Sequence, residues 1–329
     1  MRLFRRIMLG LLAAGVLTFL ALPLIVPQQT SGTLSNREAA GPQAEFVTVN
    51  GLDVHVVTAP YAGDCTCNEP LFILMHGFGA STYSWRDVIA PLSEAGTVLA
   101  YDRPAFGFTE RPVTWTGENP YGDAGNMALI DGLIAKYAGG HPVVLVGHSA
   151  GGALAAEYAL EYPDAVSGLI LVDPAILTTG AGPDWVRPLL ALPQLDAIGP
   201  SLVASIASSG DDLLRQSFAD PTKLTPAVYA GYHQPLQVAG WERGFWEFVR
   251  APRSSGLAQA MSSMSTPTLL ITGDADTVVP TSDTEKLAPM MPNATLVVVP
   301  DAGHLPHEEQ PNKFVDAVLA WVRVTYSTQ

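Results

Sequence analysis

The sequence predicts an α/β protein with a largely parallel sheet, and three features support this prediction. Short apolar runs recur along the chain, as is typical of strands that are buried on both faces. Helix-like stretches separate most of these runs, which is the alternation expected of a parallel sheet. An early hairpin is indicated by Asn50-Gly51, the preferred turn dipeptide, between two strand-like runs. The expected strands cover residues 46–49, 54–57, 71–75, 97–101, 143–146, 169–172, 268–271 and 296–299.

The alternation is interrupted between the sixth and seventh expected strands, where no strand-like run occurs. Prolines and aromatic residues punctuate helix-like stretches in this interval. We expect residues 174–265 to form a helical cap, set over a core made of residues 44–173 and 266–329. The aromatic content predicts an apolar roof over a binding site. The tryptophans expected in this roof are Trp185, Trp241 and Trp246.

Composition excludes several classes of protein. Of the 329 residues, 48% are hydrophobic and 15% are charged, which supplies enough apolar material for a large core. The formal net charge is −14 and no cluster of Lys and Arg offsets it, so nucleic-acid binding is excluded. The two cysteines, Cys65 and Cys67, cannot build a disulfide scaffold or a four-thiolate zinc site. We expect Cys65 and Cys67 to form a disulfide that staples their loop or to be incidental thiols. Redox catalysis is not expected, because the Cys-x-x-Cys spacing of redox pairs is absent.

The first 27 residues predict a membrane anchor. Three arginines within the first six residues precede an uncharged, mostly apolar run over residues 7–26. A helix of about 20 residues is about 30 Å long and matches the hydrocarbon core of a bilayer. The alternative is a cleaved signal peptide, but no convincing small-residue cleavage site is evident. The arginines should remain in the cytoplasm, which leaves the rest of the chain extracytoplasmic and anchored or, after cleavage, secreted. Residues 28–43, rich in small polar residues, are expected to form a flexible tether.

One motif supplies a candidate nucleophile. Gly147-His148-Ser149-Ala150-Gly151 directly follows an expected strand and opens a helix-like stretch. This is the G-x-S-x-G pattern of a nucleophile elbow, in which a strained turn holds the serine hydroxyl above the sheet edge at a helix N-terminus. The neighbours must be small because the turn is sharp. We therefore interpret Ser149 as a nucleophile rather than as a structural turn residue.

A catalytic serine needs a base, and the base needs an acid to orient it. His304 lies just after the last expected strand, in a loop that can reach the carboxyl edge of the sheet, where catalytic groups collect. Asp276, after the preceding strand, is the expected acid, with Asp173 and Asp274 as alternatives. The order Ser149, Asp276, His304 is the order associated with the nucleophile elbow. These three residues form the expected catalytic triad.

The segment His76-Gly77-Phe78-Gly79, which follows an expected strand, predicts an oxyanion hole. Acyl transfer develops negative charge on a carbonyl oxygen, and two backbone N–H groups can stabilise that charge. Phe78 and Ala150 are expected to supply these groups. His76 and His148 are expected to shape their loops rather than to take part in catalysis.

Together these motifs resemble the α/β-hydrolase superfamily, in its capped form with an H-G-F-G loop. The resemblance extends from about residue 46 to residue 325. It implies the α/β-hydrolase fold: a mostly parallel eight-stranded sheet with a helical cap between strands 6 and 7, and no cofactor. Because the family usually has Gly where Ala105 stands, the backbone of that loop is expected to differ slightly. We expect Asp102 and Arg103 to form a salt bridge. Further matching pieces are Ser84-Trp85, Asp102-Arg103-Pro104-Ala105-Phe106-Gly107, Gly273-x-x-Asp276-x-x-Val279-Pro280 and Gly303-His304.

The resemblance implies an enzyme, and the elbow residue narrows its chemistry. Similar epoxide hydrolases and haloalkane dehalogenases have Asp at this position, so Ser149 argues against both. We expect a serine hydrolase that cleaves carboxylic esters of apolar small molecules through an acyl-enzyme intermediate. The alternatives are a C–C bond hydrolase, a cofactor-free perhydrolase or haloperoxidase with the same triad, and a non-catalytic binding protein. No cofactor or metal is expected, since the sequence has neither a phosphate-binding glycine loop nor zinc-ligand spacing.

Overall fold

A computed structural model describes residues 2–26, 31–63, 69–177, 187–207 and 210–326; Cys65, Cys67 and Trp185 lie outside them. Its centre is an eight-stranded sheet with the order β1-β2-β4-β3-β5-β6-β7-β8. The β1–β2 and β2–β4 pairs are antiparallel and the other pairs are parallel, which confirms the expected fold class. The strands are β1 (Glu45–Val49), β2 (Leu52–Ala59), β3 (Leu71–Met75), β4 (Thr97–Tyr101), β5 (Val143–His148), β6 (Gly168–Val172), β7 (Thr268–Gly273) and β8 (Ala294–Val299).

The residues of the central strands explain the layered architecture. Every residue of β3 is buried, and its side chains alternate between the two faces of the sheet. Leu71, Ile73 and Met75 join the hydrophobic cluster under α4 and α5, whereas Phe72 and Leu74 join the cluster under α3 and α14. Helices therefore cover both faces, and the strands are apolar throughout. The core helices are α3 (Ile89–Leu92), α4 (Asp123–Tyr137), α5 (Ala150–Glu161), α12 (Thr281–Leu287), α13 (Pro306–Glu309) and α14 (Pro311–Tyr326).

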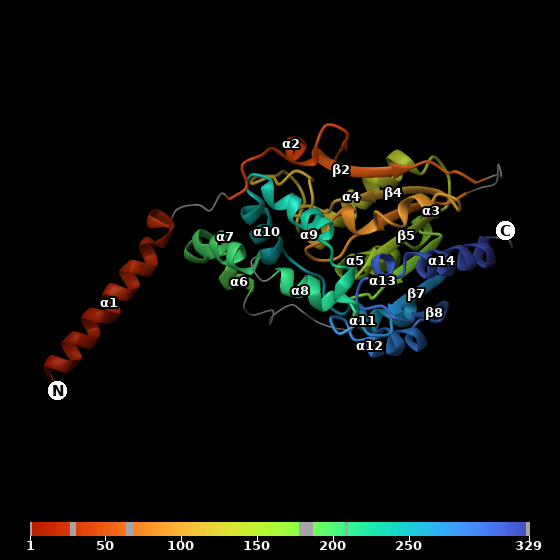
Figure 1. Cartoon of the computed structure of the whole chain (residues 1–329). Coiled ribbons are helices and arrows are strands. Elements are labelled where there is room, and N and C mark those ends of the chain that lie inside the picture. The colour runs from red at the N-terminus through yellow and green to blue at the C-terminus, as the bar shows by residue number, and fades with distance from the viewer. Residues whose placement is uncertain (1, 27–30, 64–68, 178–186, 208–209, 327–329) are drawn as a thin grey trace.

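The interval between β6 and β7 contains helices in its described part, as the sequence predicts (Figure 1). The helices of this cap are α6 (Arg187–Leu190), α7 (Pro193–Ala207), α8 (Gly210–Ser217), α9 (Pro226–His233), α10 (Trp241–Arg250) and α11 (Leu257–Ala260). Short 3-10 turns complete the described structure; they are η1 (Thr82–Trp85), η2 (Pro163–Ala165), η4 (Pro221–Lys223), η5 (Gln234–Gln237), η6 (Met261–Ser263) and η7 (Ala288–Met290).

Helix α1 (Arg2–Ile25) leaves the body beside α7 and extends away from it (Figure 1). None of its apolar segment Phe4–Ile25 is buried against the rest of the chain. By length and composition this helix could cross a bilayer, a property that signal sequences share.

The expectation of a flexible tether is wrong for residues 31–43. This stretch contains α2 (Asn36–Ala40), which begins at a capping box formed by Ser35 and Glu38. Leu34 pairs with Val238 of the cap in an isolated parallel bridge. The small polar residues of the stretch therefore act as a helix cap and as hydrogen-bond partners, roles that composition alone does not reveal.

Candidate active site

Ser149 occupies a sharp turn between β5 and α5. Its backbone has φ of 52° and ψ of −118°, a conformation that is strained for any residue with a side chain. Its N–H donates to Val172 O at 2.9 Å, which fixes the turn against β6. A Cβ atom at Gly147 would overlap the Gly151 carbonyl, and one at Gly151 would overlap the Met75 carbonyl. Both glycines of the motif are therefore required by close backbone packing.

The structure brings His304 and Asp276 together. His304 Nδ1 lies 2.7 Å from Asp276 Oδ2, and both side chains are buried. The other carboxylate oxygen, Asp276 Oδ1, accepts the N–H groups of Val278 at 2.8 Å and Val279 at 3.1 Å. These two bonds orient the carboxylate, leaving Oδ2 to hold the imidazole. With Nδ1–H donated to Asp276, Nε2 of His304 is free to accept a proton.

The two alternative acids have other partners. Asp173 Oδ1 accepts the hydroxyl of Thr272 at 2.6 Å and the N–H of Gly273 at 3.2 Å. Burial raises the pKa of Asp173 well above its usual range, and the nearby negative charge of Asp276 raises it further. Asp274 Oδ1 accepts the Ala302 N–H at 3.3 Å and so braces the turn. Of the three acids, Asp276 is the one that orients His304.

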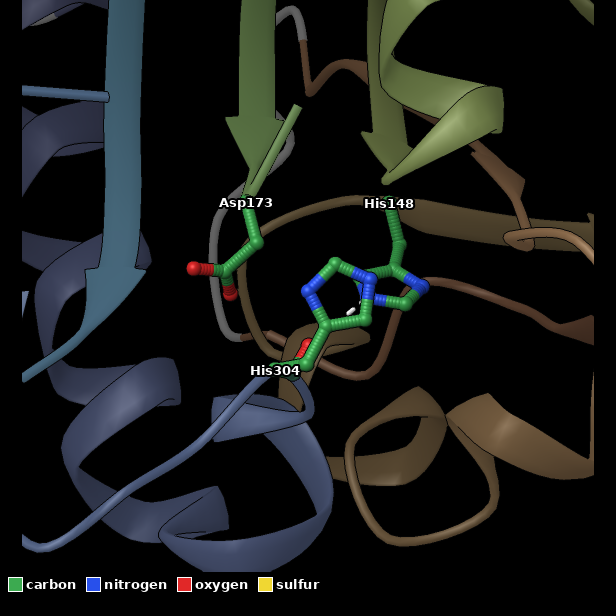
Figure 2. Close-up of side chains that lie close together, drawn as sticks. All are labelled: His148, Asp173 and His304. Carbon is green, nitrogen blue, oxygen red and sulfur yellow. Dashed lines mark hydrogen bonds between the residues drawn. The ribbon is translucent and has the colours of Figure 1, made fainter. Parts of the chain in front are cut away.

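His148, Asp173 and His304 form a compact buried cluster (Figure 2), and His148 directly precedes Ser149 in the chain. A metal ion is one possible use for such a group, since one ligand atom from each residue lies within 4.8 Å of the others. One atom of each residue already has a partner: His148 Nε2 lies 2.7 Å from His304 O, His304 Nδ1 faces Asp276, and Asp173 Oδ1 has two donors. The second atoms of two of them, His148 Nδ1 and Asp173 Oδ2, are buried without a hydrogen-bond partner in the described part of the chain. The bonds that are made hold His304 in a frame of buried polar groups.

A cavity of about 400 Å³ separates the carboxyl edge of the sheet from the cap, and both Ser149 and His304 line it. Its walls are mostly apolar. The hydrophobic side chains that contribute include Phe78, Ala105, Phe106, Val203, Leu214, Leu236, Trp241, Phe245 and Leu305. The rings of Phe78, Phe106 and Phe245 meet edge to face, with centroids 5.2 to 5.9 Å apart.

The apolar roof differs from the expected one. Trp241 lines the cavity, but Trp246 does not. Trp246 packs behind Trp241 with Val203, and its indole N–H donates to Asp196 at 3.0 Å. The expectation for Trp246 was wrong because helix periodicity directs it to the interior of the cap, where its N–H finds a carboxylate.

The sequence predicts that the backbone N–H groups of Phe78 and Ala150 form an oxyanion hole. Ala150 is the first residue of α5, so its N–H has no partner within the helix. In the described part of the chain, neither N–H donates to another protein group. Phe78 and Ser149 both border the cavity, so two free donors accompany the serine hydroxyl.

The loop after β4 departs from the expectation of a salt bridge between Asp102 and Arg103. Asp102 pairs with His55 at 2.8 Å rather than with Arg103, whose N–H donates to His76 Nε2 at 3.0 Å. Burial raises the pKa of Asp102, but the hydrogen bond and charge of His55 outweigh burial and hold it at about 2. Ala105 has φ of 81°, which costs a residue with a side chain about 1 kcal/mol or more. Ala105 therefore keeps a backbone conformation that is strained for a residue with a side chain.

Sequence reasoning missed the residues that fasten the histidine loop to the cap. The buried Glu309 carboxylate accepts the N–H groups of Gly303 at 2.6 Å, Ala219 at 3.1 Å and Asp220 at 2.9 Å. The His304 N–H donates to Ser217 O of the cap at 2.8 Å. We call these four bonds the loop clamp. Glu309 ends the short helix α13, and in the sequence it looks like an ordinary solvent-exposed acid, so this role could not be predicted from the sequence.

A second buried contact joins the same loop to the cap. Glu308 accepts hydrogen bonds from Ser84 at 2.7 Å and from Tyr232 of α9, and it pairs with Arg86 at 2.7 Å. His307 lies in the same cluster, 2.9 Å from the Ser84 hydroxyl and stacked on Trp85. Residues 303–309 are therefore held from both sides, by the cap and by the turn after β3.

Three comparisons place the chain among known proteins. The sequence profile of the alpha/beta hydrolase family matches residues 72–317. YfhM, an AB hydrolase superfamily protein of Bacillus subtilis (strain 168), is 26% identical over 86% of this chain and 99% of that protein. The magnesium-chelatase 30 kDa subunit of Rhodobacter capsulatus is 30% identical over 77% of this chain and 87% of that protein. The crystal structure of a membrane phospholipase A has a similar fold, with a TM-score of 0.62 and 24% identity over 98% of each chain.

Proposed function

This chain belongs to the alpha/beta hydrolase family, and from that premise we propose that it is a serine hydrolase that cleaves carboxylic esters with apolar acyl groups. The observation that carries the proposal is the 2.7 Å contact between His304 Nδ1 and Asp276 Oδ2 beside a cavity that Ser149 also lines. The strained elbow supports the same assignment, since strain of this kind accumulates at functional sites. This arrangement of Ser149, His304 and Asp276 beside a cavity favours an enzyme over a non-catalytic binding protein.

The proposed reaction begins when the Ser149 hydroxyl attacks the ester carbonyl carbon. His304 Nε2 accepts the hydroxyl proton, and Asp276 stabilises the imidazolium that forms. The Phe78 and Ala150 N–H groups donate to the oxyanion, and collapse of the tetrahedral intermediate expels the alcohol, which receives the proton from His304. Water then attacks the acyl-enzyme by the same steps in reverse roles and releases the carboxylic acid. Ser149, His304, Asp276, Phe78 and Ala150 supply all the groups that this sequence of steps requires.

The cavity supports an apolar acyl group as the preferred substrate. A volume of about 400 Å³ falls within the range of small-molecule sites, and its walls are mostly hydrophobic. Each methylene buried against such walls contributes about 0.8 kcal/mol, so longer acyl chains gain binding energy at the transition state. The negative net charge of the protein disfavours anionic esters in addition.

We further propose that α1 anchors the enzyme in a membrane, with the hydrolase body on the extracytoplasmic side. The exposed apolar length of the helix and the three arginines at its N-terminal end support this orientation. The similar fold of a membrane phospholipase A, over nearly the whole chain, agrees with a membrane setting.

Hydrolysis of p-nitrophenyl esters of graded chain length tests the proposal. We expect kcat/KM to rise by about tenfold or more from the acetate to a medium-chain ester, because several methylenes enter the cavity. Ser149→Ala should lower the rate by several orders of magnitude while circular dichroism shows an unchanged fold. Activity retained by Ser149→Ala would exclude Ser149 as the nucleophile. A folded wild-type protein that cleaves C–C bonds or needs peroxide, but leaves every ester intact, would contradict the ester assignment.

A further inference from the structure

The stretch that follows the membrane helix is fastened to the cap, which limits how far the body can lie from the bilayer. Ser31 N–H donates to Glu242 Oε1 at 2.7 Å, and the Ser31 hydroxyl accepts the indole N–H of Trp241 at 2.8 Å. Glu242 is fully buried, so Ser31 is held by the interior of the cap. Only five residues lie between Ile25, where α1 ends, and Ser31, so these two residues can be at most about 20 Å apart. The cap is thus held at the membrane surface.

The substrate cavity has an outer extension on this same side. A second hollow of about 780 Å³ is lined by Ser31, Thr33 and Leu34, the residues that follow the anchor. Asp211, His233 and Leu236 line both this hollow and the cavity that contains Ser149. The two hollows therefore adjoin, and the outer one lies beside the residues that follow α1.

Apolar side chains are exposed on the cap elements next to the anchor. Leu189 of α6, Leu192 in the following turn and Leu202 of α7 are 43%, 40% and 49% exposed. Helix α7 contacts α1, and α6 and α7 lie where α1 leaves the body (Figure 1). Leaving three leucines in water on a face that is tethered to a bilayer is unfavourable unless the bilayer covers them.

We propose that the α6–α7 face docks into the bilayer that holds α1, and that the substrates are acyl esters of membrane lipids that enter the cavity through the outer hollow. This inference rests on the proposed anchor and on the proposed ester hydrolysis. The occupant of the face is the lipid surface, because continuity with the anchor brings this face to the bilayer. Binding is driven by apolar contact rather than by charge, since the net charge of −14 offers no attraction to anionic lipid.

Photo-crosslinking tests the docking without relying on catalysis. The full-length protein is placed in phosphatidylcholine vesicles with a diazirine amino acid at position 192 or, as a control, at position 324. Val324 is 75% exposed on α14, at the end of the body opposite to α1 (Figure 1). We expect lipid adducts from position 192 and none from position 324. Adducts only to a second copy of the chain, or no adduct at position 192, would overturn the docking. Loss of residues 1–27 from the mature protein would overturn the anchor and this inference with it.

Kinetics test the route of entry. Leu189→Glu/Leu192→Glu is compared with Val324→Glu, and none of the three positions contacts the cavity. We expect the double variant to lose about tenfold or more in the hydrolysis of a phosphatidylcholine carried by the vesicles, because two leucine contacts with the bilayer are lost. Hydrolysis of soluble p-nitrophenyl acetate should stay within about twofold for both variants. Equal rates of the double variant and Val324→Glu on the vesicle lipid would refute entry from the bilayer. A wild-type protein that hydrolyses neither ester would refute this entry route together with the proposed ester hydrolysis, while the crosslinks still decide the docking.

Discussion

At the residue scale, the chemistry of the site depends on which of three neighbouring acids, Asp173, Asp274 or Asp276, contacts His304. Two backbone N–H groups and His304 surround the Asp276 carboxylate, an environment that stabilises negative charge. Burial and the nearby Asp276 raise the pKa of Asp173 well above its usual range, which favours the protonated form of Asp173. Asp276 is the acid that contacts His304, and Asp173 is a buried neighbour of Asp276.

This division of roles predicts opposite results for two conservative substitutions. Asp276→Asn removes the charge that stabilises the His304 imidazolium and should lower kcat on a p-nitrophenyl ester by about 10⁴-fold. Asp173→Asn replaces a carboxyl group that bonds to Thr272 and Gly273 by an amide of the same shape, and it should change kcat by less than about tenfold. Asp274→Asn, which affects only a brace of the turn, serves as the matched control. An inactive Asp173→Asn variant beside an active Asp276→Asn variant would reverse the assignment.

The residues of the site differ in how far the sequence could predict them. Ser149, Asp276 and His304 follow strands within short local patterns, and so their approach could be inferred from parallel-sheet topology. The partner of Asp102 could not, because His55 lies in β2, and only the folded sheet places β2 beside β4. The role of Glu309 could not be predicted for the same reason, since two of its three partners, Ala219 and Asp220, lie in the cap.

At the scale of elements, the loop after β8 is the part of the core most dependent on the cap. The loop clamp joins Gly303 and His304 to residues 217–220, and Tyr232 adds a bond to Glu308. The catalytic position of His304 is thus set by the cap as well as by the sheet. A movement of the cap would shift the histidine that the proposed reaction uses as its base.

The clamp predicts that Glu309→Ala affects stability and turnover together. The substitution leaves three N–H groups without a partner, each worth about 1 kcal/mol or more, so we expect the free energy of unfolding to fall by about 3 kcal/mol. kcat should fall by about tenfold or more, because the histidine loop loses its restraint. Urea denaturation and ester kinetics measure the two effects. Glu285→Ala, at an exposed position of α12, is the control and should change neither.

The elements themselves were predictable where burial is uniform. All eight strands were expected from apolar runs, and the structure extends several of them by one or two polar or small residues at their ends. The arrangement of the cap helices was not predictable, because their apolar faces pack against one another and against the sheet edge at the same time. Trp246 illustrates this, since only the packing of α10 on α7 decides that it points away from the cavity.

At the scale of the whole molecule, an unusual number of buried histidines lies around the site. His76, His148 and His307 are buried, and burial is the main cause that lowers their pKa values, to about 3 for His76 and well below the ordinary 6.5 for the other two. The folded protein keeps them neutral, whereas the unfolded chain binds their protons below about pH 6.5. Their contribution to stability is therefore complete above that pH and is lost as the pH falls.

Acid should consequently destabilise the fold well before the carboxylates titrate. Asp173 and Glu308, whose pKa values burial raises, oppose the trend because the folded state binds their protons more tightly. As the pH falls, the three histidines lower the free energy of unfolding and the two carboxyl groups raise it. Because the histidines are more numerous, we expect the free energy of unfolding to decrease by about 2 kcal/mol between about pH 7 and about pH 5. Urea denaturation at the two pH values measures it. A stability that is equal or greater at the lower pH would show that these histidines are not held neutral.

Covalent labelling shows whether Ser149 is an activated nucleophile. The folded wild-type protein is treated with a fluorophosphonate, and the modified peptide is identified by mass spectrometry. We expect one adduct, on Ser149, formed at a rate that Asp276→Asn lowers strongly, because the reagent reacts only with a serine whose proton is removed. A folded protein that remains unlabelled, or a label that persists in Ser149→Ala, would contradict this expectation.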